Sequence, residues 1–331
     1  MTKIDIISGF LGAGKTTLIN RLIHEAYSGE KIVLIENEFG EIGIDGGFLK
    51  DAGIEISEMN SGCICCSLVG DFSEALKKVV DEYAPDRILI EPSGVGKLSD
   101  VTKAVLAAEL EGAEINSAVA VVDVNKCKMY MKNFGEFFGD QISNAGCVLF
   151  SHTDKTTDTK LAEALSLVRD KNPDAVIITT PADKLSVDSL ISALEQKSTL
   201  KAHIDALIEK DACPVCGHHH HDHDEECECH DNHHHHHHHA DDIFTSWGRE
   251  TIKKYSKDDI KNILLAFDDS EKYGMVLRAK GMVECPCGKW IYFDYVPGEA
   301  DIREGSPEPI GKICVIGSKI NEDAISELFG I

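Results

Sequence analysis

The order of apolar and polar residues along the first part of the chain predicts strands that alternate with helices. Short apolar runs, typical of strands buried on both faces, occur at residues 3–8, 31–35, 87–90, 118–122, 147–150 and 176–179. Between them, apolar residues recur at the three- and four-residue spacing of one helix face, at 17–26, 72–82 and 159–170. This alternation predicts an α/β domain with a mostly parallel sheet that helices cover on both sides.

The pattern changes twice further along the chain. Residues 213–239 hold thirteen of the 16 histidines and four of the 12 cysteines, and they show no apolar periodicity. Such a composition cannot build a packed core, so we expect a flexible metal-binding linker; a purification tag over 231–239 is the rival interpretation. Apolar patterns return as strands at 274–283, 290–295 and 312–317 and helices at 258–267 and 321–329. The predicted domains are therefore 1–208, a linker 209–242, and a smaller α+β domain 243–331.

Composition narrows the classes of partner. The 331 residues carry 33 Lys and Arg against 57 Asp and Glu, a formal net charge of −24, which disfavours binding to nucleic acids or anionic membranes and favours binding to cations. No apolar run approaches the ~18 residues of a membrane helix, and the first residues lack the layout of a signal peptide. We therefore expect a cytoplasmic protein whose cysteines serve as metal ligands or, at Cys127, Cys147 and Cys314, as core residues.

Residues 9–17, GFLGAGKTT, match the phosphate-loop pattern G-x-x-x-x-G-K-[ST] between a predicted strand and a predicted helix. Its glycines allow backbone N–H groups to surround phosphate oxygens, Lys15 would reach the β- and γ-phosphates, and the Thr16 hydroxyl would hold Mg²⁺. The nucleotide-binding residues expected here are Gly9, Gly12, Ala13, Gly14, Lys15, Thr16 and Thr17.

A second nucleotide motif ends a neighbouring strand. In RILIEPSG, residues 87–94, Glu91 follows the apolar run and Gly94 lies three residues later. A carboxylate there can support the Mg²⁺ shell, and a glycine N–H can meet the γ-phosphate. Lys15, Thr16 and Glu91 are thus the predicted catalytic residues.

Four motifs in this order, GFLGAGKTT, ENEFGE (36–41), GCICC (62–66) and EPSG (91–94), resemble the CobW family of P-loop GTPases. The family includes metallochaperones and is related to the GTPases that insert nickel into hydrogenase and urease. The resemblance extends over the whole chain and implies a GTPase domain, a His-rich linker and a CobW-type C-terminal domain. It also implies GTP, GDP and a client metalloprotein as partners.

The guanine-binding motif departs from the family pattern. Where the family has N-K-x-D after a buried strand, this chain has SHTD, Ser151 to Asp154. The resemblance assigns Asp154 to the guanine N–H groups, and His152 can stack on the base in place of the lysine.

The GCICC segment follows Asn60, Ser61 and Gly62, which predict a loop. Its three thiols are suited to a borderline-soft cation such as Zn²⁺; a redox or nucleophilic cysteine is the rival hypothesis. By resemblance, carboxylates of ENEFGE join the thiols, so the predicted metal ligands are Glu36, Glu41, Cys63, Cys65 and Cys66. Because ENEFGE follows the second strand, where GTPases carry a switch, GTP hydrolysis could change the metal affinity.

Other cysteines are open to more than one interpretation. In the linker, Cys213, Cys216, Cys227, Cys229 and His230 are predicted to collect metal with low specificity, whereas Cys285 and Cys287 are either a metal site or a tight turn. The predicted function is a GTP-hydrolysing metallochaperone with Mg²⁺ as cofactor and Zn²⁺ or another transition metal as cargo. The alternatives are a cobalamin-pathway or metalloenzyme-activating GTPase for cobalt, iron or nickel, and a metal store with vestigial GTPase activity. A homodimer is left open.

Overall fold

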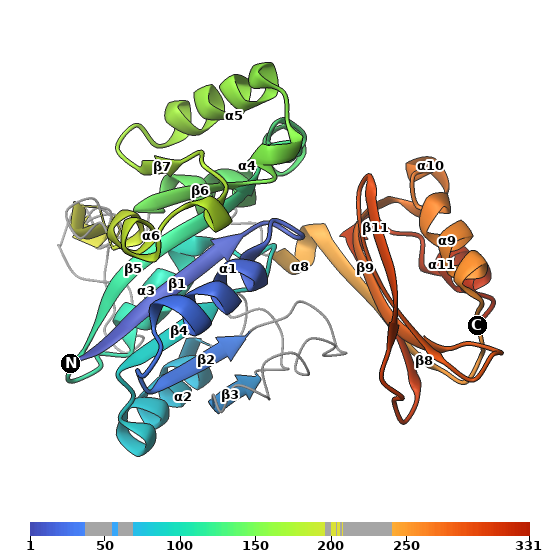
Figure 1. The fold of residues 1–331 in the computed structure, drawn as a ribbon, viewed down its shortest axis with the longest axis horizontal. Coiled ribbons are helices and arrows are strands. Elements are labelled where there is room, and N and C mark those ends of the chain that lie inside the picture. Colours follow the sequence, from blue (N-terminus) through green and yellow to red (C-terminus); the bar gives the residue numbers. More distant parts are fainter. Residues whose placement is uncertain (37–54, 59–68, 196–199, 203, 206, 208–239) are drawn as a thin grey trace, which may run out of the picture.

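The computed structural model describes residues 1–331 apart from 37–54, 59–68, 196–199, 203, 206 and 208–239. It contains a seven-stranded sheet and a separate five-stranded sheet (Figure 1). None of the helices in the described part of the chain combines the length and the apolar character needed to cross a lipid bilayer. The predicted boundaries at 208/209 and 242/243 stay predictions.

The first sheet is parallel at every described pairing, in the order β3-β2-β4-β1-β5-β6-β7. Its strands are β1 (Thr2–Gly9), β2 (Ile32–Glu36), β3 (Glu55–Glu58), β4 (Arg87–Glu91), β5 (Ala113–Asp123), β6 (Cys147–Ser151) and β7 (Val176–Ile178). The associated helices are α1 (Lys15–Arg21), a π-helical turn η1 (Leu22–Ala26), α2 (Val69–Tyr83), α3 (Leu98–Ala107), α4 (Cys127–Ser143), η3 (Thr153–Lys155), α5 (Asp158–Lys171), η4 (Ala182–Lys184) and α6 (Val187–Leu194).

The strands β1, β2, β4, β5, β6 and β7 place alternate residues in two different cores, which explains their apolar runs. Ile4 and Ile6 of β1 pack with α2, α3, α4 and α5, while Ile7 packs on the opposite face with α1, η1 and α6. In β5, Ala120 faces the first core and Val121 the second. Successive side chains of a strand point to opposite faces, so a sheet that helices cover on both sides favours apolar residues on both faces of its strands, as predicted.

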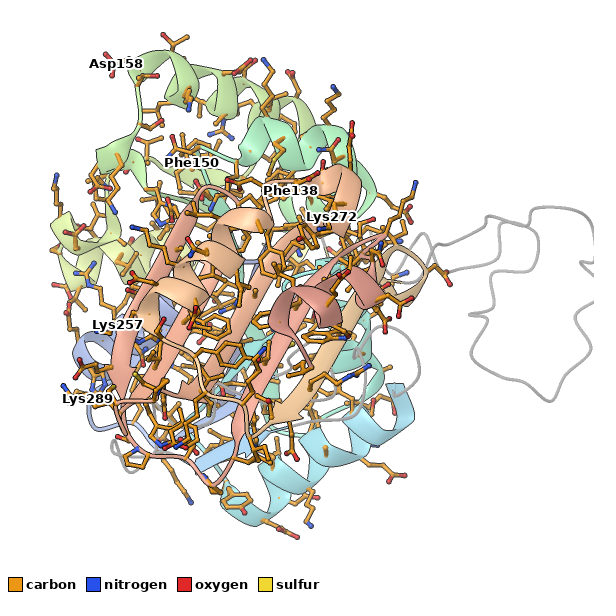
Figure 2. The ribbon with its side chains drawn as sticks, turned by 90° about the vertical axis from the view of Figure 1, so that its right-hand side faces the viewer. Phe138, Phe150, Asp158, Lys257, Lys272 and Lys289 are labelled. Carbon is orange, nitrogen blue, oxygen red and sulfur yellow. The ribbon has the colours of Figure 1, made fainter. Side chains whose placement is uncertain are left out.

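The C-terminal part forms an antiparallel sheet in the order β11-β10-β9-β12-β8. Its elements are α8 (Ala240–Ile243), β8 (Phe244–Thr251), α9 (Lys257–Ala266), α10 (Ser270–Tyr273), β9 (Met275–Glu284), β10 (Trp290–Val296), β11 (Glu299–Gly305), β12 (Gly311–Ser318) and α11 (Glu322–Phe329). Figure 2 views this sheet with its helices toward the reader. Those helices pack on Trp247, Phe293 and Val315, while the opposite face of the sheet contacts the first domain.

The predicted strands and helices are confirmed, with differences at some boundaries. β5 begins at Ala113, five residues before the predicted start at 118. The prediction missed this first half because Glu114, Asn116 and Ser117 are polar and interrupt the apolar run. The predicted helix at 17–26 begins at Lys15 and continues as the π-helical turn η1. β3, β8 and β11 were not predicted from the sequence; β11 is exposed and polar, as edge strands often are. Cys127, Cys147 and Cys314 are buried, as predicted.

A buried ionic network lies beside the start of β4, away from the phosphate loop. The guanidinium of Arg87, 2% exposed, pairs with Asp5, with Glu30 at 2.7 Å and with Glu195 at 3.4 Å. It also lies over the ring of Tyr27, 3.6 Å from the centroid. These contacts connect β1, β4 and the segment after α6.

Asp5 completes the network. Its Oδ1 accepts hydrogen bonds from Asn116 Nδ2 at 2.8 Å and from the Ser117 hydroxyl at 2.6 Å. The polar first half of β5 is thus explained by the carboxylate of the neighbouring strand. Because a buried carboxylate is costly without its partners, Arg87 stabilises the centre of the sheet.

We expect Arg87→Ala to lower the free energy of unfolding by about 3–5 kcal/mol, because it leaves Asp5 buried without its cation. Urea denaturation measures this loss. The control Lys78→Ala removes a lysine that is 70% exposed and paired only on the surface of α2, so it should cost about 1 kcal/mol or less. Equal losses in the two variants would contradict a stabilising role for the network.

Candidate nucleotide site

The phosphate loop connects β1 to α1 at the carboxyl edge of the parallel sheet, where ligands of α/β proteins bind. Gly14 caps α1 in the left-handed conformation, at φ 97° and ψ 23°, which a residue with a side chain adopts only at a cost. The Ala13 N–H donates to the Phe10 carbonyl over 3.1 Å. The loop therefore has the turn that the motif requires.

Three side chains predicted to be catalytic lie together next to this loop. Lys15 is 6% exposed, and its Nζ lies 3.9 Å from Glu91 Oε1. The Thr16 hydroxyl lies 3.2 and 3.3 Å from the two carboxylate oxygens of Glu91. Because β4 is the direct neighbour of β1, the end of one strand meets the loop of the other, as the sequence predicts.

The loop after β4 is held against the phosphate loop. A Cβ on Gly94 would lie 2.7 Å from Leu11 Cδ2 and 3.1 Å from the Leu11 backbone nitrogen, so a side chain at this position would displace Leu11. Gln141 of α4 donates from Nε2 to the carbonyl of Gly94 at 3.3 Å and to that of Gly96 at 2.8 Å. Sequence analysis missed Gln141, since one polar residue in an amphipathic helix gives no signal.

His152 and Asp154 lie at the end of β6. His152 has the left-handed conformation, φ 57°, and precedes the short helix η3, which contains the exposed Asp154. The imidazole Nδ1 of His152 is 3.1 Å from Oδ2 of Asp123, the last residue of β5. Lys126 Nζ lies 3.3 Å from the same carboxylate oxygen.

This pairing shifts both pKa values. The hydrogen bond to Asp123 raises the pKa of His152 above its ordinary value of 6.5; burial opposes the rise, Glu299 adds to it and Lys126 reduces it. Burial tends to raise the pKa of Asp123, but the hydrogen bond from His152 and the charge of Lys126 outweigh it and leave that pKa below 3.8. Sequence analysis missed Asp123, although an acid at the end of a strand was the signal that identified Glu91.

A cavity of about 790 Å³ lies over the phosphate loop, within the ~300–1,000 Å³ typical of ligand sites. Its wall on the first domain includes Lys15, Thr16, Glu91 and His152. The C-terminal sheet supplies the other wall, with residues Arg278, Asp294, Val296, Gly298, Glu299, Ala300, Asp301 and Arg303. Sequence analysis did not predict a contribution from this sheet.

The turn between β10 and β11 approaches the phosphate loop closely. A Cβ on Gly12 would lie 2.4 Å from Val296 Cγ1, and Gly12 itself has φ 71°. Arg278 pairs with Asp294 over 3.4 Å, and Arg303 pairs with Asp301. Two cations and several carboxylates of the second domain therefore face the candidate nucleotide site.

Of the predicted metal ligands in the first domain, the structure describes Glu36. It ends β2, is buried, and lies in register with Glu91 of β4. The other predicted ligands lie outside the described residues: Glu41, Cys63, Cys65, Cys66, Cys213, Cys216, Cys227, Cys229 and His230. Within the described residues, no group of three or more His, Cys, Asp or Glu side chains could hold a metal ion.

Comparison with known proteins gives relatives that match about half of the chain. The chain is 34% identical over 158 residues to the zinc chaperone YeiR of Escherichia coli strain K12, which covers 47% of this chain and 48% of the relative. It is 33% identical over 195 residues to the zinc chaperone CobW of a Sinorhizobium species, covering 50% and 54%. It is 29% identical over 175 residues to the zinc-regulated GTPase metalloprotein activator 1 of Schizosaccharomyces pombe strain 972. That match covers 50% of this chain and 41% of the relative. The chain spans about half the length of the curated relatives it matches.

The sequence model of the CobW/HypB/UreG nucleotide-binding domain matches residues 3–179. This range begins in β1, ends just after β7, and includes the phosphate loop, Glu91, His152 and Asp154. Since the match covers more than half of the 331 residues, the chain belongs to the CobW/HypB/UreG family.

Proposed function

We propose that this chain is a GTP-hydrolysing metallochaperone in which the nucleotide at the phosphate loop sets the affinity of a neighbouring site for a transition metal, with Zn²⁺ as the first candidate. The observation that carries this proposal is the register of two acids. Glu36, a proposed metal ligand, and Glu91, at the nucleotide site, are paired residues at the carboxyl ends of adjacent parallel strands. Neighbouring strands lie only about 4.8 Å apart.

For the nucleotide, Lys15 would contact the β- and γ-phosphates and stabilise the charge that develops as the γ-phosphoryl group leaves. The backbone N–H of Gly94, kept close to Leu11, would contact the γ-phosphate. Thr16 and Glu91 bring together the hydroxyl and carboxylate oxygens that Mg²⁺ prefers. They would hold the Mg²⁺ that accompanies GTP and neutralises charge on its phosphates.

For the base, Asp154 would accept hydrogen bonds from two guanine N–H groups. His152 would pack its ring along the base, and the ion pair with Asp123 would fix the orientation of that ring. A ring held in this way loses less conformational entropy when a ligand binds, so Asp123 would support nucleotide binding without touching the nucleotide.

For the metal, Glu36 would act with Glu41, Cys63, Cys65 and Cys66, a mixed set of carboxylates and thiolates that suits Zn²⁺. The names of the relatives, zinc chaperone and metalloprotein activator, support zinc as cargo and a metalloprotein as the client. Cys213, Cys216, Cys227, Cys229 and His230 would supply weaker sites. The proposal places the chain in a reducing compartment such as the cytoplasm, where thiols remain available as ligands.

We expect Lys15→Ala to weaken GTP binding by about 10- to 150-fold, because it removes a charged contact worth ~1.5–3 kcal/mol. Titration calorimetry measures the affinity, and circular dichroism shows whether the fold is retained. Lys160→Ala, a change at an exposed position of α5, serves as the control and should leave the affinity unchanged. Equal affinities in all three proteins would refute the role of the phosphate loop.

Asp123→Asn should lower the pKa of His152, because the carboxylate supplies both the hydrogen bond and the charge that raise it. Proton NMR of the imidazole measures this pKa, with His152→Gln to assign the resonance. The exposed change Asp158→Asn is the control. An unchanged His152 titration in Asp123→Asn would mean that the two side chains are not paired in solution.

The same pair makes stability depend on pH. Because the folded-state pKa of His152 lies above 6.5, its contribution is complete below pH 6.5 and is lost as pH rises through the folded pKa. Because the folded-state pKa of Asp123 lies below 3.8, its contribution is present above 3.8 and is lost as pH falls through that lower value. The difference in unfolding free energy between the unmodified protein and Asp123→Asn should therefore decrease as pH rises through the folded pKa of His152 and as pH falls through the folded pKa of Asp123.

The coupling between nucleotide and metal is tested in protein that lacks residues 213–239, so that linker ligands do not contribute. We expect Zn²⁺ affinity to differ by about 5- to 150-fold between the GDP complex and the complex with a non-hydrolysable GTP analogue. Glu36→Gln and Cys65→Ser should reduce this difference, whereas Glu82→Gln, an exposed change on α2, should not. Equal Zn²⁺ affinities in the two nucleotide states would instead describe a metal store that does not use GTP.

A further inference from the structure

The turn between β9 and β10 carries two cysteines, and neither belongs to the nucleotide site. Cys285 and Gly288 close a four-residue turn through the hydrogen bond from the Gly288 N–H to the Cys285 carbonyl, 2.8 Å long. Pro286 occupies the second position, and Gly288 has the left-handed conformation with φ 80°. Proline and glycine at these places are the residues that such a turn needs, so its backbone does not require a cysteine at either of the other positions.

The two thiol groups of this turn lie together. The Cys287 N–H lies 3.3 Å from Cys285 Sγ and donates to it, and the two thiols are close enough for each to shift the pKa of the other. Two sulfur ligands of one tetrahedral zinc ion, each at ~2.3 Å, are about 3.8 Å apart. Both cysteines belong to one four-residue turn closed by a backbone hydrogen bond, so one ion can be reached by both thiols without unfolding of the turn.

The surroundings leave both thiols accessible and favour the ionised form of Cys287. Cys287 is exposed and Cys285 is partly exposed. Lys289 and Lys257 lie close together at this end of the sheet (Figure 2), joined through Glu304 at 2.9 and 3.4 Å. Positive charge next to an exposed thiol favours its ionised form, which is the form that binds metals.

The pKa values of the buried cysteines differ from those of the two cysteines in the turn. Burial raises the pKa of Cys127 and of Cys147 to about 12, so both stay protonated at neutral pH. Cys287 is exposed, and its interaction with Cys285 lowers its pKa, whereas the same interaction raises the pKa of Cys285.

We propose that Cys285 and Cys287 form an exposed two-thiolate site for Zn²⁺, with the remaining coordination positions open to water or to ligands of another protein. Within the described residues no third His, Cys, Asp or Glu side chain joins them. A structural zinc site is closed by four protein ligands, so this site has room for incoming ligands and suits transfer of an ion more than its storage. The inference goes beyond the proposed function, since it involves no nucleotide.

The test uses the full chain without nucleotide and measures alkylation of each cysteine by iodoacetamide, resolved by peptide mass spectrometry at buffered free Zn²⁺. At a free Zn²⁺ concentration about ten times the dissociation constant, alkylation of Cys285 and Cys287 should slow by about tenfold, since only the metal-free fraction reacts. Mg²⁺ at the same concentration should have no effect. The buried Cys127 and Cys147 serve as internal controls for an intact fold.

Two variants separate a shared site from independent thiols. Cys285→Ser should remove the Zn²⁺ protection of Cys287, and Cys287→Ser should remove that of Cys285. The proposal is overturned if Zn²⁺ protects neither thiol, or if the remaining thiol stays equally protected in either variant. It is also overturned if both thiols are unreactive without Zn²⁺ and recover with a reductant, because the pair would then be a disulfide. Loss of nucleotide binding, as in Lys15→Ala, should not alter any of these outcomes.

Discussion

The buried ring of Phe10 connects the phosphate loop to both domains. It lies within the loop itself, fully buried, with its centroid 4.5 Å from that of Tyr130 and 5.6 Å from that of Phe134, both on α4. Phe244, the first residue of β8, packs at 6.0 Å from Phe10 and 5.2 Å from Phe134. Aromatic residues bury large apolar areas and prefer such tilted contacts. The position of the loop, the helix behind it and the first strand of the second sheet therefore depend on one cluster.

This cluster gives the C-terminal sheet a structural role at the candidate nucleotide site. Phe244 of β8 packs against Phe10 of the loop, and Val296 of β10, in the same sheet, lies against Gly12 of the loop. Close-packed contacts transmit displacement because they cannot be compressed. A nucleotide that moved the loop would therefore act on two strands of the second sheet, and a partner that moved this sheet would act on the loop.

Elements and residues that depend on local sequence were predictable, whereas those that depend on long-range pairs were not. The strands buried on both faces gave continuous apolar runs, and the convergence of Lys15, Thr16 and Glu91 followed from a motif and from the rule that carboxyl ends of parallel strands meet at one edge. The polar start of β5 was missed because its partner, Asp5, lies in another strand. Asp123 was missed for a similar reason, since its importance comes from His152. The wall formed by the C-terminal sheet could not be deduced from either segment alone.

The net charge of −24 has opposite consequences for the two proposed ligands. A strongly acidic chain attracts cations and repels the phosphates of a nucleotide, so zinc collection is favoured over the whole surface, whereas GTP needs a local region of positive potential. At the candidate cavity the first domain supplies that charge, since Lys15 and Lys155 outnumber Glu91 there, whereas on the C-terminal wall Asp294, Glu299 and Asp301 outnumber Arg278 and Arg303. The two arginines are partly neutralised by Asp294 and Asp301, which weakens their long-range attraction but holds them at the cavity. The positive potential that a nucleotide needs at this cavity therefore comes from the wall of the first domain, because the C-terminal wall has one more carboxylate than it has arginines.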